Sequence, residues 1–203
     1  MTEATVSKKS AIIIFVLAAI LVTWIDLWSK QAVHEFLEVE TIETSDGKPR
    51  IVDPRKYFVV IKNFFWLEYT YNYGAFSGWF SKHTNGLAIL SGIALAVIAG
   101  VFFFYVRATT RPGILFSLSL GLIWGGTCGN FYDRALLGGV RDWIRWFIVY
   151  DGRELIWPNF NVADAGICVG VSLWILREIR TLLRERREQR QGEAQSTEAS
   201  SEA

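Results

Sequence analysis

Long apolar stretches constrain this chain more than any other feature of its sequence. The segments 86–106 and 113–132 contain no charged residue, and about 20 such residues suffice for a helix to cross the hydrocarbon core of a bilayer. The stretches 11–25 and 160–176 reach that length with their flanking residues. We therefore expect an all-α membrane bundle of four transmembrane helices, at about 11–29, 86–106, 113–132 and 160–180.

Composition agrees with a membrane protein. Of the 203 residues, 51% are hydrophobic and nine are tryptophan, whereas soluble domains reach about 45–50% only when glycine is counted. The net charge of +1 gives no indication of nucleic-acid binding. Cys128 and Cys168 each lie in an apolar stretch, which favours buried packing residues over a disulfide.

Basic residues near the helix ends predict the orientation. Lys8 and Lys9 precede the first stretch, Arg107 and Arg111 flank the turn between the second and third, and several arginines follow the fourth. Basic residues accumulate on the cytoplasmic side of membrane proteins. Both termini should therefore be cytoplasmic, and the loops at about 31–85 and 134–159 should lie outside.

The outer loops are expected to form a small β-rich cradle on the extracytoplasmic face. Segment 57–71 is aromatic and β-branched, which is typical of strands. Two short apolar runs meet at Asp151-Gly152, a turn pair that favours a β-hairpin. One membrane domain, 1–183, would hold these parts. The charged, polar segment 184–203 should be a disordered cytoplasmic tail.

Polar residues in the apolar stretches are the candidate site. An ionisable residue inside a span is costly and indicates function by default. Asp164 follows Asn161 by three positions, so the two share a helical face. Asn130, Asp133 and Arg134 share a face by the same spacing. Taken alone, Asp164 is equally well explained as a structural acid satisfied by Asn161.

A second carboxylate lies beyond the third stretch. Asp142 follows closely in the chain, so Asp142 and Asp164 can both lie at the outer mouth of the bundle. Two neighbouring carboxylates share a proton. One then draws a proton from water while the other polarises a scissile carbonyl, with no need for a metal, cofactor or covalent intermediate. Alone, Asp142 would more often be a solvated loop charge.

Two other pairs have simpler structural interpretations. Asp133 beside Arg134 is most simply a structural ion pair at a helix end. Asp26 and Lys30 are four residues apart, and we expect an interfacial pair whose lysine extends toward water.

The motifs together resemble the lipoprotein signal peptidases (signal peptidase II). Five segments occur in the family's order across most of residues 11–180: DLWSK with Asp26 and Lys30, Asn72-Tyr73-Gly74-Ala75, GGTCGNFYDR at 125–134, VRDW at 140–143, and FNVADA at 160–165. The GGxxGNxxDR and FNxAD patterns are specific, whereas the Asp-to-Lys spacing alone is weak.

The resemblance implies an aspartic endopeptidase in a bacterial inner membrane. Its catalytic pair corresponds to Asp142 and Asp164. Its substrate would be a prolipoprotein, cut just before a cysteine that carries a diacylglyceryl group. Asp26 and Lys30 would support the site. The residues expected to bind substrate or hold the pair are Asn72, Gly74, Asn130, Arg134 and Asn161.

The resemblance also implies an oligomeric state and a lipid environment, and the sequence departs from the family's pattern at a few positions. A monomer in contact with membrane lipids is expected, without metal or cofactor. Phe76 follows Ala75 directly, Trp143 follows Asp142, and the first outer loop is long. These departures bear on loop conformation and substrate preference more than on the reaction.

Other functions fit the sequence less well. A transport or proton-relay subunit also uses intramembrane acids, but it would more often show inverted repeats and broken helices at mid-membrane. The chain contains neither the GxSxG motif of many serine hydrolases nor the HExxH motif of metalloproteases, which argues against both classes.

Overall fold

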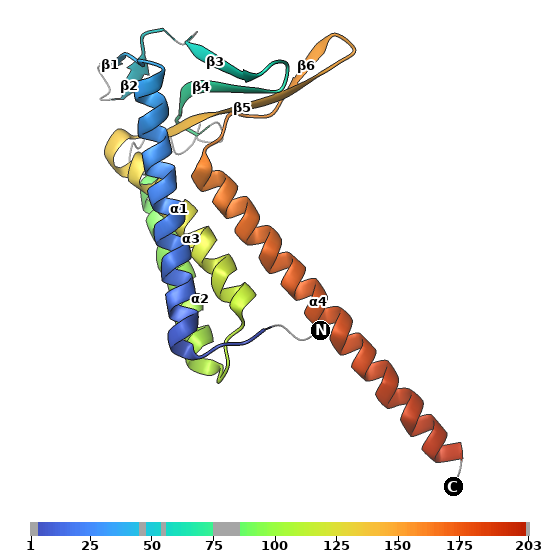
Figure 1. The fold of residues 1–203 in the computed structure, drawn as a ribbon. Coiled ribbons are helices and arrows are strands. Elements are labelled where there is room, and N and C mark those ends of the chain that lie inside the picture. The colour runs from blue at the N-terminus through green and yellow to red at the C-terminus, as the bar shows by residue number, and fades with distance from the viewer. Residues whose placement is uncertain (1–3, 45–47, 54–55, 75–85, 202–203) are drawn as a thin grey trace.

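Four helices form a bundle with a small sheet over one end (Figure 1). The computed structural model describes residues 4–44, 48–53, 56–74 and 86–201, with side chains described as far as residue 191. The helices are α1 (Lys8–Phe36), α2 (Gly86–Ala108), α3 (Ile114–Leu137) and α4 (Val162–Ser201). All four predicted helices are therefore present, and α1 extends further in both directions than predicted.

Three of these helices, α1, α2 and α3, are long and apolar enough to cross a membrane within the described part of the chain. The uncharged run of α4 is shorter, because Asp164 lies near its start and Arg177 and Glu178 interrupt it later. A span needs about 20 apolar residues. The fourth transmembrane span thus stays a prediction, although the helix exists.

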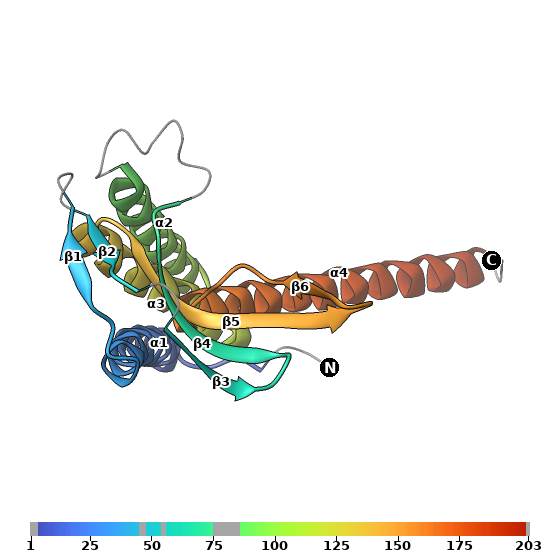
Figure 2. The ribbon, with the colours of Figure 1, turned by 90° about the horizontal axis from the view of Figure 1, so that it is seen from above.

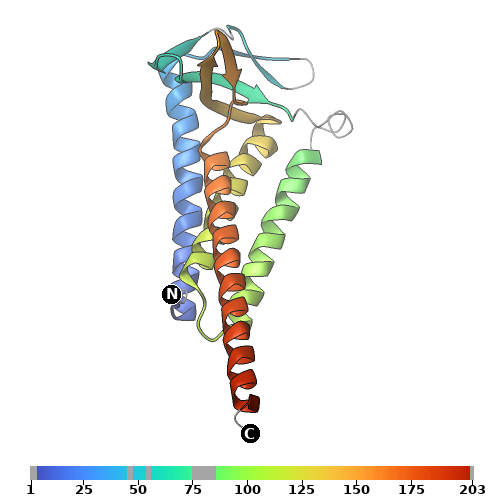
Figure 3. The same ribbon diagram turned by 90° about the vertical axis from the view of Figure 1, so that its right-hand side faces the viewer.

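Helix α3 lies at the centre of the bundle and packs against each of the other three helices (Figure 3). Its glycines explain the close approach. A Cβ on Gly125 would lie 2.5 Å from the carbonyl oxygen of Ala19 in α1, and one on Gly126 would overlap the carbonyl oxygen of Ala163 in α4. Small residues at such contacts allow membrane helices to pack backbone to backbone. The GGTCG segment is therefore a two-sided packing surface.

Six strands form the predicted β-rich part: β1 (Thr41–Glu43), β2 (Pro49–Ile51), β3 (Tyr57–Ile61), β4 (Phe65–Asn72), β5 (Val140–Tyr150) and β6 (Arg153–Ile156). β3 to β6 form an antiparallel sheet in chain order, and β1 pairs with β2. The predicted strand 57–71 is thus a hairpin of two strands. The hairpin predicted at Asp151-Gly152 is confirmed, and the positive φ of both residues suits a tight turn.

The sheet and the chain termini lie at opposite ends of the helices (Figure 3). Seen from above, β4 and β5 cross the helix ends, while β1 and β2 stand beside the end of α1 (Figure 2). The main chain of Phe160 pairs with that of Ile144 in β5. This bridge ties the start of α4 directly to the sheet.

The structure differs from the sequence-based expectations at three places. Asp142 lies in strand β5, not in a loop. Cys168 is exposed rather than buried. The segment from 184 onward, expected to be disordered, continues α4 as helix to Ser201. Its arginines, glutamates and glutamines are good helix formers, and Arg184 pairs with Glu188 one turn later. Local propensity thus supports a helix that has no core to pack against.

The glycine packing predicts an asymmetry between two Gly→Ala substitutions. Gly125→Ala should lower the thermal unfolding midpoint in detergent by about 2–8 °C, because overpacking costs about 1–3 kcal/mol. Gly100→Ala in α2 is the matched control, since a Cβ there meets nothing within 4 Å, and alanine is the better helix former. Equal midpoints for the two variants, measured by tryptophan fluorescence, would contradict the packing role of Gly125.

Candidate active site

A fully buried lysine lies where three elements meet at the sheet end of the bundle. Lys30 Nζ lies 2.6 Å from Asp26 Oδ2 in α1 and 2.9 Å from Asp133 Oδ2 in α3. All three side chains are 0% exposed. The predicted Asp26–Lys30 pair is present, but the expectation of a lysine reaching water is wrong, because Asp133 provides a second buried partner.

Asp133 joins this lysine to the sheet. Its Oδ1 accepts hydrogen bonds from Arg141 Nε and Nη2 at 2.9 and 2.6 Å, and its Oδ2 accepts one from the Arg141 backbone N–H at 3.0 Å. The pair expected between Asp133 and Arg134 is therefore not the one formed. Asp26, Lys30, Asp133 and Arg141 form a charge cluster with two acids and two bases. This balance matters, because an unpaired buried charge is expensive.

Asn130 links the charge cluster to the candidate catalytic residues. Its Oδ1 accepts from Lys30 Nζ at 3.2 Å and from Asn161 Nδ2 at 3.1 Å. Its Nδ2 donates to Asp164 Oδ1 at 2.8 Å. Because Lys30 and Asn161 both donate to the oxygen, the amide orientation is fixed and the NH2 group must face Asp164.

The first turn of α4 holds Asp164 in place. Asn161 is the residue before the helix, and its Oδ1 accepts from the Asp164 N–H at 3.0 Å, while Asp164 Oδ2 accepts from the Asn161 N–H at 3.3 Å. This reciprocal pattern is a capping box. The Ala163 N–H donates to Asp26 Oδ1 at 2.9 Å, so the charge cluster also fixes this helix end. The FNVADA motif thus encodes a cap and a carboxylate together.

Asp142 lies on β5 and faces the same asparagine. Its Oδ1 accepts from Asn161 Nδ2 at 2.7 Å, and its Oδ2 accepts from Asn72 Nδ2 at 3.1 Å. The side chain is buried. Burial, together with the negative charge of Asp164, raises the pKa of Asp142 from 3.8 to about 7, against the opposing effect of its hydrogen bonds and Lys30. Asp142 is therefore readily protonated near neutral pH.

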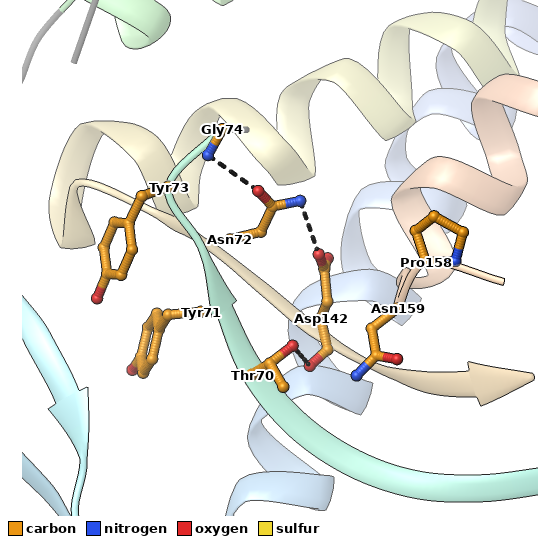
Figure 4. A pocket seen from close by; sticks show the side chains of 8 residues that line it. All are labelled: Thr70, Tyr71, Asn72, Tyr73, Gly74, Asp142, Pro158 and Asn159. Carbon is orange, nitrogen blue, oxygen red and sulfur yellow. Dashed lines mark hydrogen bonds between the residues drawn. The ribbon is translucent and has the colours of Figure 1, made fainter. Parts of the chain in front are cut away.

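A pocket of about 430 Å³ opens beside Asp142 (Figure 4). Asn72, at the end of β4, points at Asp142, and its Oδ1 accepts from the Gly74 N–H at 2.9 Å. Gly74 has a φ of 85°, which favours glycine. Pro158 and Asn159, just before α4, line the opposite side. Ala75 and Phe76 of the motif lie outside the described residues.

Arg134 is the predicted site residue that the described contacts tie least closely to the carboxylates. Its Nη1 donates to Ser91 Oγ of α2 at 3.1 Å. It also interacts electrostatically with Asp164 and Asp142. The structure thus brings the other predicted residues together around the two aspartates, while Arg134 connects the site to α2.

Sequence reasoning missed the role of Arg141. Nothing in the sequence around Arg141 indicates its partner, because only the packing of α3 against β5 brings it to Asp133. Thr70 was also missed; its hydroxyl donates weakly to the Asp142 carbonyl at 3.4 Å. As for metals, the His, Cys, Asp and Glu side chains of the described ranges form no group of three or more that could hold an ion.

Comparisons with known proteins point to one family. Residues 18–180 match the family described as "Signal peptidase (SPase) II". A lipoprotein signal peptidase of Coxiella burnetii is 33% identical over 167 residues, which are 80% of this chain and 88% of that protein. One from Pseudoalteromonas atlantica is 37% identical over 115 residues, 56% of this chain and 67% of the other.

The fold is also similar to a solved structure described as a bacterial membrane enzyme. The TM-score is 0.61 at 24% identity, over 89% of this chain and 93% of the other. At that identity the likeness concerns the fold.

The charge cluster predicts a rescue experiment. Lys30→Met leaves the carboxylates of Asp26 and Asp133 buried without their shared cation, and should destabilise the protein by about 3–5 kcal/mol. Adding Asp26→Asn restores the charge balance, because Asp133 keeps Arg141. Thermal unfolding of the double variant should therefore occur at a higher temperature than that of Lys30→Met. A double variant less stable than the single one would contradict charge balance as the stabilising factor.

The raised pKa of Asp142 predicts how stability depends on pH. Between about pH 4 and pH 7 the folded protein binds a proton at Asp142 that the unfolded chain does not, so rising pH lowers the stability of wild type. Asp142→Asn removes this titration. Going from pH 5 to pH 8, the unfolding midpoint of wild type should fall relative to that of the variant, by about 5 °C. A constant difference would show that Asp142 has an ordinary pKa.

Proposed function

This chain belongs to the signal peptidase II family, and from that premise we propose that it removes the signal peptide from diacylglyceryl-modified prolipoproteins. It is a multi-pass membrane protein and a protease of the lipoprotein-processing type. The proposed reaction is hydrolysis of the peptide bond just before the lipidated cysteine. The observation that carries it is the pair Asp142 and Asp164, both held by one asparagine, Asn161.

The proposed catalyst is a carboxylate pair with one proton. Burial of Asp142 beside Asp164 favours the protonated form of Asp142 near neutral pH. In that state Asp142 donates to the scissile carbonyl, and the Asp164 carboxylate draws a proton from the attacking water. The two groups titrate as a unit, so the proton is shared and the roles exchange during the reaction.

The surrounding amides hold both carboxylates ready. Asn72 and Asn161 donate to separate oxygens of Asp142, and Asn130 donates to Asp164. Hydrogen bonds from locked side chains restrict the carboxyl orientations, which lowers the reorganisation needed in the transition state. Lys30 is hydrogen-bonded to Asn130 and ion-paired with Asp26 and Asp133, and is a positioning residue in this scheme.

The position of the pair fits a substrate that spans the membrane. Asp142 lies in the sheet and Asp164 in the first turn of α4, at the end of the bundle away from both termini (Figure 1). We propose that this end is extracytoplasmic and that the termini are cytoplasmic, in keeping with the basic residues near them. A signal peptide helix beside the bundle would then bring its carboxyl end to the aspartates, with the acyl chains in the bilayer.

The decisive experiment compares three Asp→Asn variants on one substrate. Asp142→Asn and Asp164→Asn should each lower cleavage of a diacylglyceryl-modified prolipoprotein by about a thousandfold or more, because an amide cannot share the proton. Asp151→Asn is the matched control: Asp151 is exposed in the β5–β6 turn, and asparagine tolerates its positive φ. Cleavage is measured by gel shift with purified, folded protein in detergent.

Two results would change the assignment. Substantial cleavage by either folded variant would remove that residue from the catalytic pair. Absence of cleavage by folded wild type on several lipid-modified substrates would reject the peptidase proposal, and proton-flux measurements in vesicles would then test the transport alternative.

A further inference from the structure

A second pocket lies on the other side of β4 from Asn72. It encloses about 810 Å³ between the β1–β2 hairpin and β4. Tyr69 and Tyr71 line it from β4 and Tyr73 from just beyond the end of that strand, and alternate residues of a strand point to the same face. The Tyr73 hydroxyl donates to the carbonyl of Pro49, which ties the hairpin to the strand. We call this pocket the hairpin groove.

Within the part of the chain that the structure describes, the charged side chains that line the hairpin groove have one sign. Among the described residues around it, the charged ones are Lys48 and Arg50, both on or beside β2. Glu40 and Glu43 belong to the same hairpin region but do not line the groove. The Lys48 ammonium lies 5.4 Å from the centre of the Tyr73 ring. An aromatic wall with two cations attracts a polar segment that carries negative charge.

The hairpin groove adjoins the pocket at Asp142 across strand β4. Thr70, Tyr71 and Tyr73 line both. Figure 4 shows how the strand divides them: the side chain of Asn72 faces Asp142, whereas those of Tyr71 and Tyr73 turn to the opposite side. The two pockets therefore lie next to each other, on opposite faces of one strand at the sheet end of the bundle.

The position of the hairpin groove and its two cations favour one part of the proposed substrate, although Ile42, Ile51 and Val52 also line the groove. The signal peptide before the scissile bond is apolar, and so are the acyl chains on the cysteine. The mature chain after the cysteine is polar and must lead away from the membrane. Strands β1, β2 and β4, whose residues line the hairpin groove, lie on the sheet side of the helix ends, where that chain has to pass (Figure 2).

We propose that the hairpin groove binds the first residues of the mature lipoprotein after the lipidated cysteine, and that Lys48 and Arg50 favour acidic residues there. This inference rests on the proposed peptidase function. It makes the groove a specificity site, separate from the residues that perform hydrolysis. Lys48 and Arg50 would change substrate preference without touching the reacting bond.

The test uses three substrates with the same signal peptide and lipidated cysteine. The four residues after the cysteine are all glutamate, all serine or all lysine. Wild type should cleave the glutamate substrate with a kcat/KM about fivefold or more above that of the lysine substrate at low ionic strength. Because the groove is open to water, the preference should shrink as salt is added.

The matched variants separate a local effect from net charge. Lys48→Glu with Arg50→Glu should abolish or invert the preference and leave kcat/KM for the serine substrate near wild type. Lys62→Glu with Arg153→Glu makes the same charge change at exposed positions that line neither pocket, and should keep the preference. If the glutamate pair unfolds the hairpin, Lys48→Gln with Arg50→Gln should still remove most of the preference.

Each other outcome has one meaning. Failure of wild type to cleave any of the substrates rejects the peptidase function itself. Cleavage of all three with equal kcat/KM overturns the groove proposal and leaves the peptidase function standing. If the Lys48 and Arg50 variants slow all substrates equally, and only in anionic nanodiscs as compared with zwitterionic ones, the groove binds a lipid headgroup and the proposal is wrong.

Discussion

The buried ammonium of Lys30 is the contact on which the geometry of the candidate site depends. A cation with no exposed surface needs anionic partners, and Asp26 and Asp133 supply them from two different helices. Each acid also has a second partner. Asp133 binds Arg141 of the sheet, and Asp26 accepts a hydrogen bond from the Ala163 N–H in the first turn of α4. Satisfying one lysine therefore fixes α1, α3, α4 and β5 relative to one another.

The same network explains why the site tolerates two neighbouring acids. The charge cluster contains equal numbers of acids and bases, and its two cations, Lys30 and Arg141, are ion-paired with Asp26 and Asp133. Asp142 and Asp164 receive hydrogen bonds mainly from neutral amides of Asn72, Asn130 and Asn161. Neutral donors orient a carboxylate but offset its charge less than a cation would. Burial and the neighbouring charge of Asp164 therefore raise the pKa of Asp142, and the hydrogen bonds from Asn72 and Asn161 offset that effect only in part.

How much the sequence could predict depended on the range of the interaction. Local patterns were enough for the helices, the Asp151-Gly152 hairpin and the Asn161–Asp164 face, because spacing along the chain determines them. The family resemblance added Asn72 and favoured a catalytic Asp142 over a solvated loop charge. Pairings between distant segments were beyond local reasoning: Asp133 was assigned to its neighbour Arg134, yet binds Lys30 and Arg141. Lys30 looked like an interfacial lysine because its second acid lies on another helix. The helical tail was missed because its charged, polar composition was taken to indicate disorder, although its helix propensity is local information.

Strand β4 lines two pockets within one short segment. Its alternation sends Thr70 and Asn72 toward Asp142 and Tyr71 and Tyr73 toward the hairpin groove (Figure 4). The pairing register with β5 shifts between Leu67 and Thr70, and this irregularity sets which residues oppose Asp142. A further shift by one residue would exchange the two faces and place a tyrosine against the carboxylate. Correct orientation of Asp142 and access to the groove therefore depend on a single register, so substitutions that disturb β4 would affect hydrolysis and substrate preference together.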